Sequence, residues 1–173
     1  NISEAKCQKV KLEEAFDLIP PERIVFQNDA RDIIGVAMEM LDGETEYKGQ
    51  NYTVAFGHLR TAVEKYDRLN YSEPWSWMMP PRHALGALLL EQGHVAEAKE
   101  VYRADLGLDD TLVRPSQHPG NIWSLLGYQE CCKRSGDEAG QTEIVEILEA
   151  AKKVADPAIS TSCFCRTEVA CCD

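Results

Sequence analysis

The sequence predicts an all-α fold, an α-solenoid of about three helix pairs. Turn-forming residues separate the paired helices in each copy, at 49–52, 93–95 and 135–137. Two antiparallel helices approach closely only where side chains are small, so we expect a glycine in the first helix to face an alanine in the second. This step recurs three times at one interval: Gly43 to Ala55, Gly86 to Ala98, and Gly127 to Ala139.

The first 27 residues lie outside this repeat and predict one helix followed by a linker. Apolar residues share one helical face before Pro20 and Pro21 end the helix. These residues are Ile2, Ala5, Leu12, Phe16 and Ile19. We expect the helix to cover the open end of the first pair, or to remain from a preceding repeat.

The repeats occupy residues 28–156, with individual units predicted at 28–66, 79–106 and 120–156. They recur after about 43 and then about 41 residues, against about 34 in the standard helix-pair repeat. The connections at 67–77 and 107–120 account for the added length. Trp75 and Trp77 lie in the first connection, where we expect them to pack over the junction of two repeats; stacking on a partner is the alternative.

The residues around the Gly-to-Ala steps resemble the tetratricopeptide repeat (TPR) family. The second copy reads Leu85, Gly86 and Leu89, followed by Ala98 and Tyr102; the third reads Trp123, Leu126 and Gly127, followed by Ala139. The resemblance covers about residues 28–165. This part of the chain is similar to the last repeats of larger microbial TPR proteins, and membership of that group implies no specific activity. Because the chain opens on Asn1, we expect a mature product or a fragment.

The third repeat is expected to close the array. Glu143 and Glu146 replace apolar residues on its second helix, and a polar outer face is typical of a terminal capping repeat. Beyond Pro157, residues 157–173 form a predicted cysteine-rich tail.

The TPR resemblance implies a concave groove lined by the first helix of each pair. The groove lacks the lysines that bind a terminal carboxylate in chaperone-binding members, so we expect it to accept another extended segment or helix, or a neighbouring domain of the parent chain. His83 and Tyr128 are expected on one wall. The predicted groove residues are Met40, Glu44, Tyr47, His83, Ala87, Leu90, Asn121, Ser124 and Tyr128.

The charge of the chain excludes some partners. A net charge of −11 and a pI near 4.8 argue against nucleic acid, because phosphate binding requires clustered Lys and Arg. The same charge repels anionic membranes and favours basic or neutral protein partners. An alternative is that acidity only keeps the solenoid soluble. No apolar stretch approaches the roughly 20 residues of a membrane span.

Seven cysteines permit three interpretations: disulfides, inert thiols or a soft-metal site. We expect disulfides, with Cys131 or Cys132 bonded to the tail so that the tail folds back onto the array. No Cys-x-x-Cys pair typical of structural zinc is present, so no metal site is predicted. The candidates are Cys7, Cys131, Cys132, Cys163, Cys165, Cys171 and Cys172.

Two glycosylation sequons fall in predicted surface turns, at Asn51 and Asn70. A helix-capping role is the alternative for Asn51. Together with the cysteines, the sequons slightly favour a secretory or other extracytoplasmic compartment over the cytoplasm.

The sequence predicts no enzyme and no cofactor. The four histidines lack metal-ligand spacing, and no nucleophile, phosphate-binding or dinucleotide motif is present. We therefore predict a non-catalytic interaction or assembly module that binds a peptide segment or neighbouring domain. The alternative is a thiol-based metal-binding or redox protein that uses Cys163, Cys165, Cys171 and Cys172.

Overall fold

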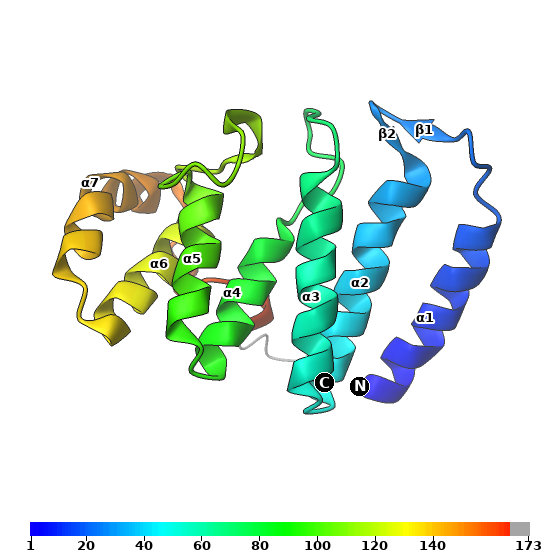
Figure 1. Cartoon of the computed structure of the whole chain (residues 1–173), viewed down its shortest axis with the longest axis horizontal. Coiled ribbons are helices and arrows are strands. Elements are labelled where there is room, and N and C mark those ends of the chain that lie inside the picture. Colours follow the sequence, from blue (N-terminus) through cyan, green and yellow to red (C-terminus); the bar gives the residue numbers. More distant parts are fainter. Residues whose placement is uncertain (167–173) are drawn as a thin grey trace. The chain divides into compact units, whose positions relative to one another are not determined.

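The computed structural model describes residues 1–166 and is helical (Figure 1). The chain divides into two compact units, Asn1–Pro81 and the part that begins at Arg82. The first unit contains α1 (Ile2–Asp17), α2 (Ala30–Lys48) and α3 (Tyr52–Asp67). The second contains α4 (Pro81–Glu91, from the last residue of the first unit), α5 (Val95–Leu106), α6 (Ile122–Ser135) and α7 (Glu138–Val154).

Helix α1 is capped by Asn1, whose side chain accepts hydrogen bonds from the amides of Ser3 and Glu4. None of its residues is buried. It is tied to α2 by an ion pair between Lys9 and Asp42, whose closest atoms, Nζ and Oδ1, are 2.7 Å apart. Polar contacts at its edges therefore contribute to holding α1, in addition to partly buried apolar side chains.

A short antiparallel hairpin, β1 (Ile24–Val25) and β2 (Asn28–Asp29), replaces part of the predicted linker between α1 and α2. Phe26, in its turn, has a φ of 55°, and its side chain is exposed. Asp29 then caps α2 by accepting a hydrogen bond from the amide of Arg31. The hairpin was not predicted because two-residue strands are too short to show alternation.

Helices α2 and α3 form the pair in which the predicted close approach is present. A Cβ added at Gly43 would lie 2.7 Å from Leu59 Cγ and 3.3 Å from the carbonyl oxygen of Ala55. Ala55, Leu59 and Ala62 are fully buried. Gln50 makes the turn between the helices with a φ of 64°.

The connection after α3 is held by a buried asparagine of the hairpin. The side chain of Asn28 accepts a hydrogen bond from the amide of Asn70 (2.6 Å) and donates to the carbonyl oxygen of Asn70 and to Ser76 Oγ, both at 2.8 Å. Trp75 and Trp77 in this connection are half-buried. The lengthened connection is thus an ordered part of the first unit.

In the second unit, one aromatic ring fills the space that two glycines leave. A Cβ added at Gly86 of α4 would lie 2.5 Å from Tyr102 Cζ, and one at Gly127 of α6 would also meet this ring. Tyr102 lies on α5 and is completely buried. The prediction that Gly86 faces Ala98 differs from this arrangement, since the ring of Tyr102 supplies the nearest atoms.

The predicted approach of Gly127 to Ala139 is wrong, because Ala139 is exposed. The close approach of α7 to α6 occurs at the next residue, Gly140. A Cβ there would lie 2.8 Å from Cys132 Sγ and 3.0 Å from the Tyr128 hydroxyl. The third pair therefore keeps small residues at its contact but shifts by one position.

Candidate partner-binding surface

The predicted groove residues are mostly buried. Met40 and Asn121 are half-buried, and Glu44 is exposed. The other six lie in the interior: Tyr47, His83, Ala87, Leu90, Ser124 and Tyr128. The expectation that these six side chains line an open groove is therefore wrong. Residues of α4 account for three of them, and this helix is buried along its whole length except Glu91.

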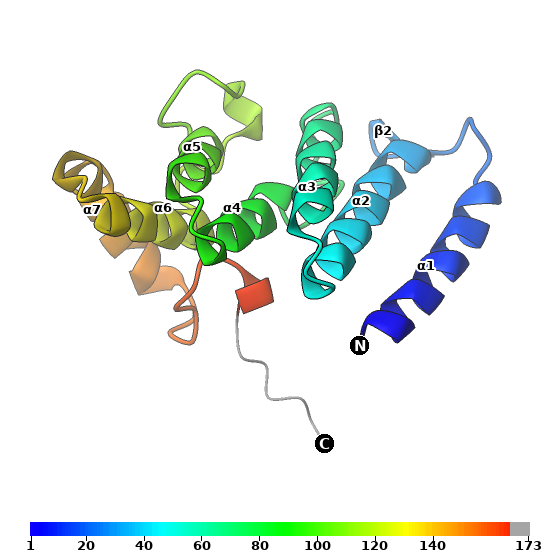
Figure 2. The ribbon, with the colours of Figure 1, turned by 60° about the horizontal axis from the view of Figure 1, so that its bottom comes forward.

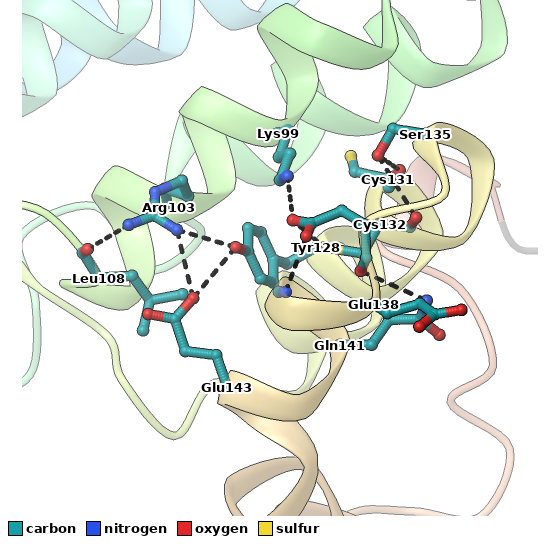
Figure 3. A network of polar contacts seen from close by, with 12 residues as sticks. Lys99, Arg103, Leu108, Tyr128, Cys131, Cys132, Ser135, Glu138, Gln141 and Glu143 are labelled. Atoms are coloured by element: carbon teal, nitrogen blue, oxygen red, sulfur yellow. Dashed lines mark hydrogen bonds and ion pairs between the residues drawn. The ribbon is translucent and has the colours of Figure 1, made fainter.

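Tyr128 belongs to a polar network that joins α5, α6 and α7 (Figure 3). Arg103 Nη1 donates to the Tyr128 hydroxyl at 2.9 Å and to Glu143 at 3.2 Å. The Tyr128 hydroxyl also donates to Glu143 at 3.2 Å. Burial raises the pKa of Tyr128 to about 12, so the hydroxyl stays protonated and keeps both roles. Glu143 is thus part of a helix contact as well as of the polar outer face predicted for α7.

The same network fastens the turn between α6 and α7. Asp137 caps α7 by accepting a hydrogen bond from the amide of Gly140 at 3.0 Å. Its carboxylate also binds the ammonium of Lys99, from α5. The hydrogen bond from Lys99 holds the pKa of Asp137 below its usual range. A partly exposed pair of this kind contributes modestly to stability, but it orients the capping residue.

His83 belongs to a second network, around the buried carboxylate of Asp105. Asp105 Oδ1 is 2.9 Å from His118 Nδ1, and Oδ2 is 3.2 Å from His83 Nε2. Ser124 donates a further hydrogen bond to Oδ2. The backbone adds a bond, 2.6 Å from the amide of His118 to the carbonyl oxygen of Asp105. Asp105 is only 1% exposed.

Burial by itself raises the pKa of Asp105, but hydrogen bonds from His118 and His83 outweigh it and hold the pKa well below its ordinary value. The carboxylate is therefore ionised and its lone pairs are used inside the protein. A site without solvent access, in which each polar atom already has a partner, is suited to fixing structure rather than to turnover. His83 is thus a structural residue.

The cysteines do not form the predicted clasp. Cys163 is bonded to Cys165, whereas Cys131 and Cys132 are buried free thiols, so the expected bond from α6 to the tail is wrong. Burial raises the pKa of Cys131 to about 12, which leaves almost no thiolate near neutral pH. Cys7 is free and exposed. The remaining candidates, Cys171 and Cys172, lie outside the described residues.

Within residues 1–166, no cluster of three or more His, Cys, Asp or Glu side chains could hold a metal ion. The helices in this range include none that is both long and apolar enough to cross a bilayer.

The segment 156–166, here the returning segment, turns back towards α6 after α7 ends (Figure 2). Ser162 and Cys163 are 1% and 2% exposed. Arg166 Nη1 donates to Glu130 Oε2, on α6, at 2.9 Å. The buried hydroxyl of Tyr102 makes no hydrogen bond of regular geometry. Its polar neighbour is Ser162, which interacts with it less directly.

The returning segment therefore packs on the helices of the second unit, to which it belongs, through two buried small side chains and one charge-assisted hydrogen bond. The fold-back of the tail agrees with the expectation from the sequence, but the attachment is not the expected disulfide. Ser162 and Arg166 were missed because nothing in their sequence context distinguishes them. The mixture of Ser, Thr and Cys at 160–163 reads as a loop.

Both sequon asparagines lie at exposed positions in turns. The side-chain nitrogen Nδ2 of Asn51 donates to Glu46 Oε2 at 2.7 Å, and Nδ2 of Asn70 donates to the carbonyl oxygen of Gln27 at 2.9 Å. Asn51 precedes α3 but makes no side-chain capping bond. These nitrogens are the atoms to which a glycan attaches, and each carries a second hydrogen that this hydrogen bond does not use.

No model of a known protein family, no curated protein and no solved structure matches this chain.

Proposed function

We propose that the chain is a non-catalytic interaction module of the TPR type, which binds an extended peptide or a segment of a neighbouring domain. The observation that carries the proposal is the returning segment on the surface of α5 and α6. It buries Ser162 and Cys163 and pairs Arg166 with Glu130. These are the contacts by which a bound peptide gains affinity, a few buried anchors and a charge-assisted hydrogen bond.

The arrangement of the second unit supports a repeat-type scaffold for this role. Tyr102 packs against glycines of both the preceding and the following helix. Stacked helix pairs of this kind present successive first helices side by side, which makes an elongated surface for a partner. On this proposal, the returning segment is an internal ligand that an external peptide displaces or extends.

A peptide-binding test on the full chain addresses the proposal. Peptides selected from a random display library are labelled, and their affinity is measured by fluorescence anisotropy. If they bind where the returning segment lies, Glu130→Lys should weaken binding about tenfold in an Arg166→Ala background, where the returning segment has already lost this ion pair, because it reverses the charge that a bound peptide would meet.

Arg166→Ala should have the opposite effect. An intramolecular competitor acts at an effective concentration of about millimolar, so loosening it should increase the affinity for an external peptide. Lys152→Ala is the matched control, since Lys152 also pairs with a glutamate, Glu149, but on the exposed face of α7. Selected peptides whose affinity is indifferent to both Glu130→Lys and Arg166→Ala would contradict the proposed surface.

One observation favours the second candidate function, a thiol-based redox role, namely the bond between Cys163 and Cys165. Thiol counting of the purified protein, before and after reduction, with metal analysis, separates the two functions. Loss of peptide binding in Cys163→Ser, with a measurable disulfide-exchange activity in the parent chain, would favour the redox role over the interaction module.

A further inference from the structure

A cleft of about 470 Å³ lies in the first unit between α1, α2 and α3. It is remote in sequence from the returning segment and takes no part in the surface proposed above. Small-ligand sites have volumes of roughly 300–1,000 Å³ and combine apolar walls with a few placed polar groups. The apolar lining includes Phe16, Met38 and Leu69, and the cationic lining is Arg31, Lys65 and Arg68.

Arg31 is held in place at the cleft by its inner atoms. Its Nε donates to the carbonyl oxygen of Ile19 at 3.0 Å, and its Cζ lies 4.9 Å from the centroid of the Phe16 ring. Within residues 1–166, its two terminal nitrogens make no hydrogen bond or ion pair. The guanidinium is thus oriented by the protein while its terminal donors are available to a ligand.

The other two cations lie at the C-terminal end of α3, where Lys65 is in the last turn and Arg68 is the C-cap. Lys65 Nζ is 2.9 Å from Glu39 Oε1, and the second oxygen of Glu39 is 2.7 Å from His58 Nδ1. These partners position Lys65. Among the described residues, Arg68 has only a 3.9 Å ion pair with Glu64, and its side chain is 78% exposed. The lining has three cations and one acidic residue, Asp32. Because Glu39 pairs with Lys65, the positive charge open to a ligand comes from Arg31 and Arg68.

Gly35 contributes to the lining of the cleft from the middle of α2. A Cβ at this position would lie 3.6 Å from Lys65 Cδ and Nζ, an ordinary contact, whereas at Gly43 it would lie 2.7 Å from Leu59. Helix packing therefore requires glycine at Gly43 but not at Gly35. A glycine inside a helix costs roughly 0.5–1 kcal/mol relative to alanine. Its effect at Gly35 is to leave space in the cleft.

We propose that this cleft binds an organic anion, a carboxylate or phosphate carried on an apolar group. Arg31 and Arg68 would bind the anion by charge-assisted hydrogen bonds, with Lys65 beside them. Phe16, Met38 and Leu69 would contact the apolar group. Charge complementarity selects an anion over a cation, and the apolar wall selects an organic ligand over a bare inorganic ion.

The probes are phenylacetate, phenyl phosphate and the neutral benzyl alcohol, titrated into the ¹⁵N-labelled full chain and followed by NMR. We expect one of the anions to shift the amide signals of Gly35 and Met38 saturably. Benzyl alcohol should bind at least about tenfold more weakly, since it lacks the charge. The tighter of the two anions identifies the group that the site prefers.

Gly35→Leu fills the cleft and Arg68→Glu reverses an exposed charge; each should weaken anion binding about tenfold or more. Their matched controls are Gly57→Leu, at an exposed helical glycine with nothing within 4 Å, and Arg114→Glu, in the second unit. Both controls should bind the anion like the parent chain. Arg68→Glu keeps the test valid if Gly35→Leu unfolds the helix pair.

Three results would overturn the proposal. Equal affinity for phenylacetate, phenyl phosphate and benzyl alcohol would show that the cleft binds the apolar group without recognising the anion. Binding unchanged in a folded Gly35→Leu variant, or signals shifted elsewhere in the chain only, would remove the anion from the cleft.

Discussion

The first helix pair, α2 and α3, and the second, α4 and α5, fill equivalent buried positions with different side chains, apolar in the first pair and charged in the second. Met40 and Ala62 stand at the same intervals from Gly43 as His83 and Asp105 from Gly86. Ala62 is completely buried in an apolar contact surface, and Asp105, equally buried, is ionised and hydrogen-bonded to His83. The repeat register therefore sets where a side chain lies, but not whether that place is apolar or charged.

The buried charge of Asp105 requires contacts from more of the chain than the buried Ala62 does. An isolated buried carboxylate is costly, so Asp105 needs partners beyond His83. His118 comes from the connection before α6 and Ser124 from α6 itself. The long connection at 107–120, which lengthens the predicted repeat, thus contributes to the interior of the second unit.

The largest expected effect is on the buried charge. Asp105→Ala should lower the free energy of unfolding by about 3–5 kcal/mol, because it leaves His83, His118 and Ser124 without their acceptor. Adding His83→Met, which copies the first pair, should recover part of the loss. Denaturant unfolding measures both variants, with the exposed Asp110→Ala as control. A loss below about 1 kcal/mol would mean that the pair is not coupled as described.

A second prediction compares the glycines of the two pairs. Gly86→Ala should destabilise by about 2–3 kcal/mol, because the new methyl group meets the ring of Tyr102, which is itself enclosed by α6. Gly43→Ala should cost less, about 1–2 kcal/mol, because its methyl group meets the smaller side chain of Leu59 and the carbonyl oxygen of Ala55. Gly57→Ala, at an open position, should stabilise α3 by about 0.5–1 kcal/mol. Thermal unfolding of the three variants tests the order, and equal losses at Gly86 and Gly43 would contradict it.

A third prediction concerns acid. The folded-state pKa of Asp105 is lowered from 3.8, so its stabilisation is fully present above about pH 4 and is lost as the pH falls through the lowered value. In that range the second unit should lose up to about 1.4 kcal/mol per pH unit from this group. Trp123 is the only tryptophan beyond Arg82, so its fluorescence reports the second unit in a Trp75→Phe/Trp77→Phe background.

The control for the acid experiment is Asp105→Asn. The amide cannot titrate, so the pH dependence below pH 4 should flatten although the variant is less stable at neutral pH. An equally steep acid transition in Asp105→Asn would assign it to other carboxylates.

The prediction with the smallest effect on stability compares the reactivity of Cys7, in the first unit, with that of Cys131, in the second. In a Cys171→Ser/Cys172→Ser background, exposed Cys7 should react with a disulfide reagent at pH 8 within minutes. Cys131, whose pKa is about 12, should react at least about 100-fold more slowly until the protein unfolds. Rapid labelling of Cys131 in the native state would show that α6 opens locally.

Sequence periodicity was informative about the helices and misleading about their exposed faces. The helix pairs fall where the Gly-to-Ala steps placed them, and Gly43 approaches Ala55 as expected. His83 and Tyr128, predicted to share a groove wall, are both buried in polar networks. Their replacement by alanine would therefore test stability rather than binding. A predicted binding surface depends on what covers it, and the helical pattern carries no information on that.

One signal for the buried network was present in the sequence. Asp105 occupies the place at which the first pair has Ala62, and an acidic residue at a position enclosed by helices requires a partner. The identity of the partners was not accessible in this way. His118 is separated from Asp105 by a connection without regular periodicity, and Ser124 is an ordinary residue for the first turn of a helix.

The sequence by itself determined the all-α class, the helix boundaries to within a few residues and the small residues at the α2–α3 contact, because these follow from local periodicity and from turn-forming residues. Only the tertiary structure decided that Tyr102 lies between Gly86 and Gly127, that Asp105 gathers two histidines, and that Cys163 bonds to Cys165 rather than to α6. The first two depend on which helices come together in space, and such contacts are set by the fit of side chains from separate elements. The bond between Cys163 and Cys165 is local, but cysteine spacing alone did not select it among seven cysteines.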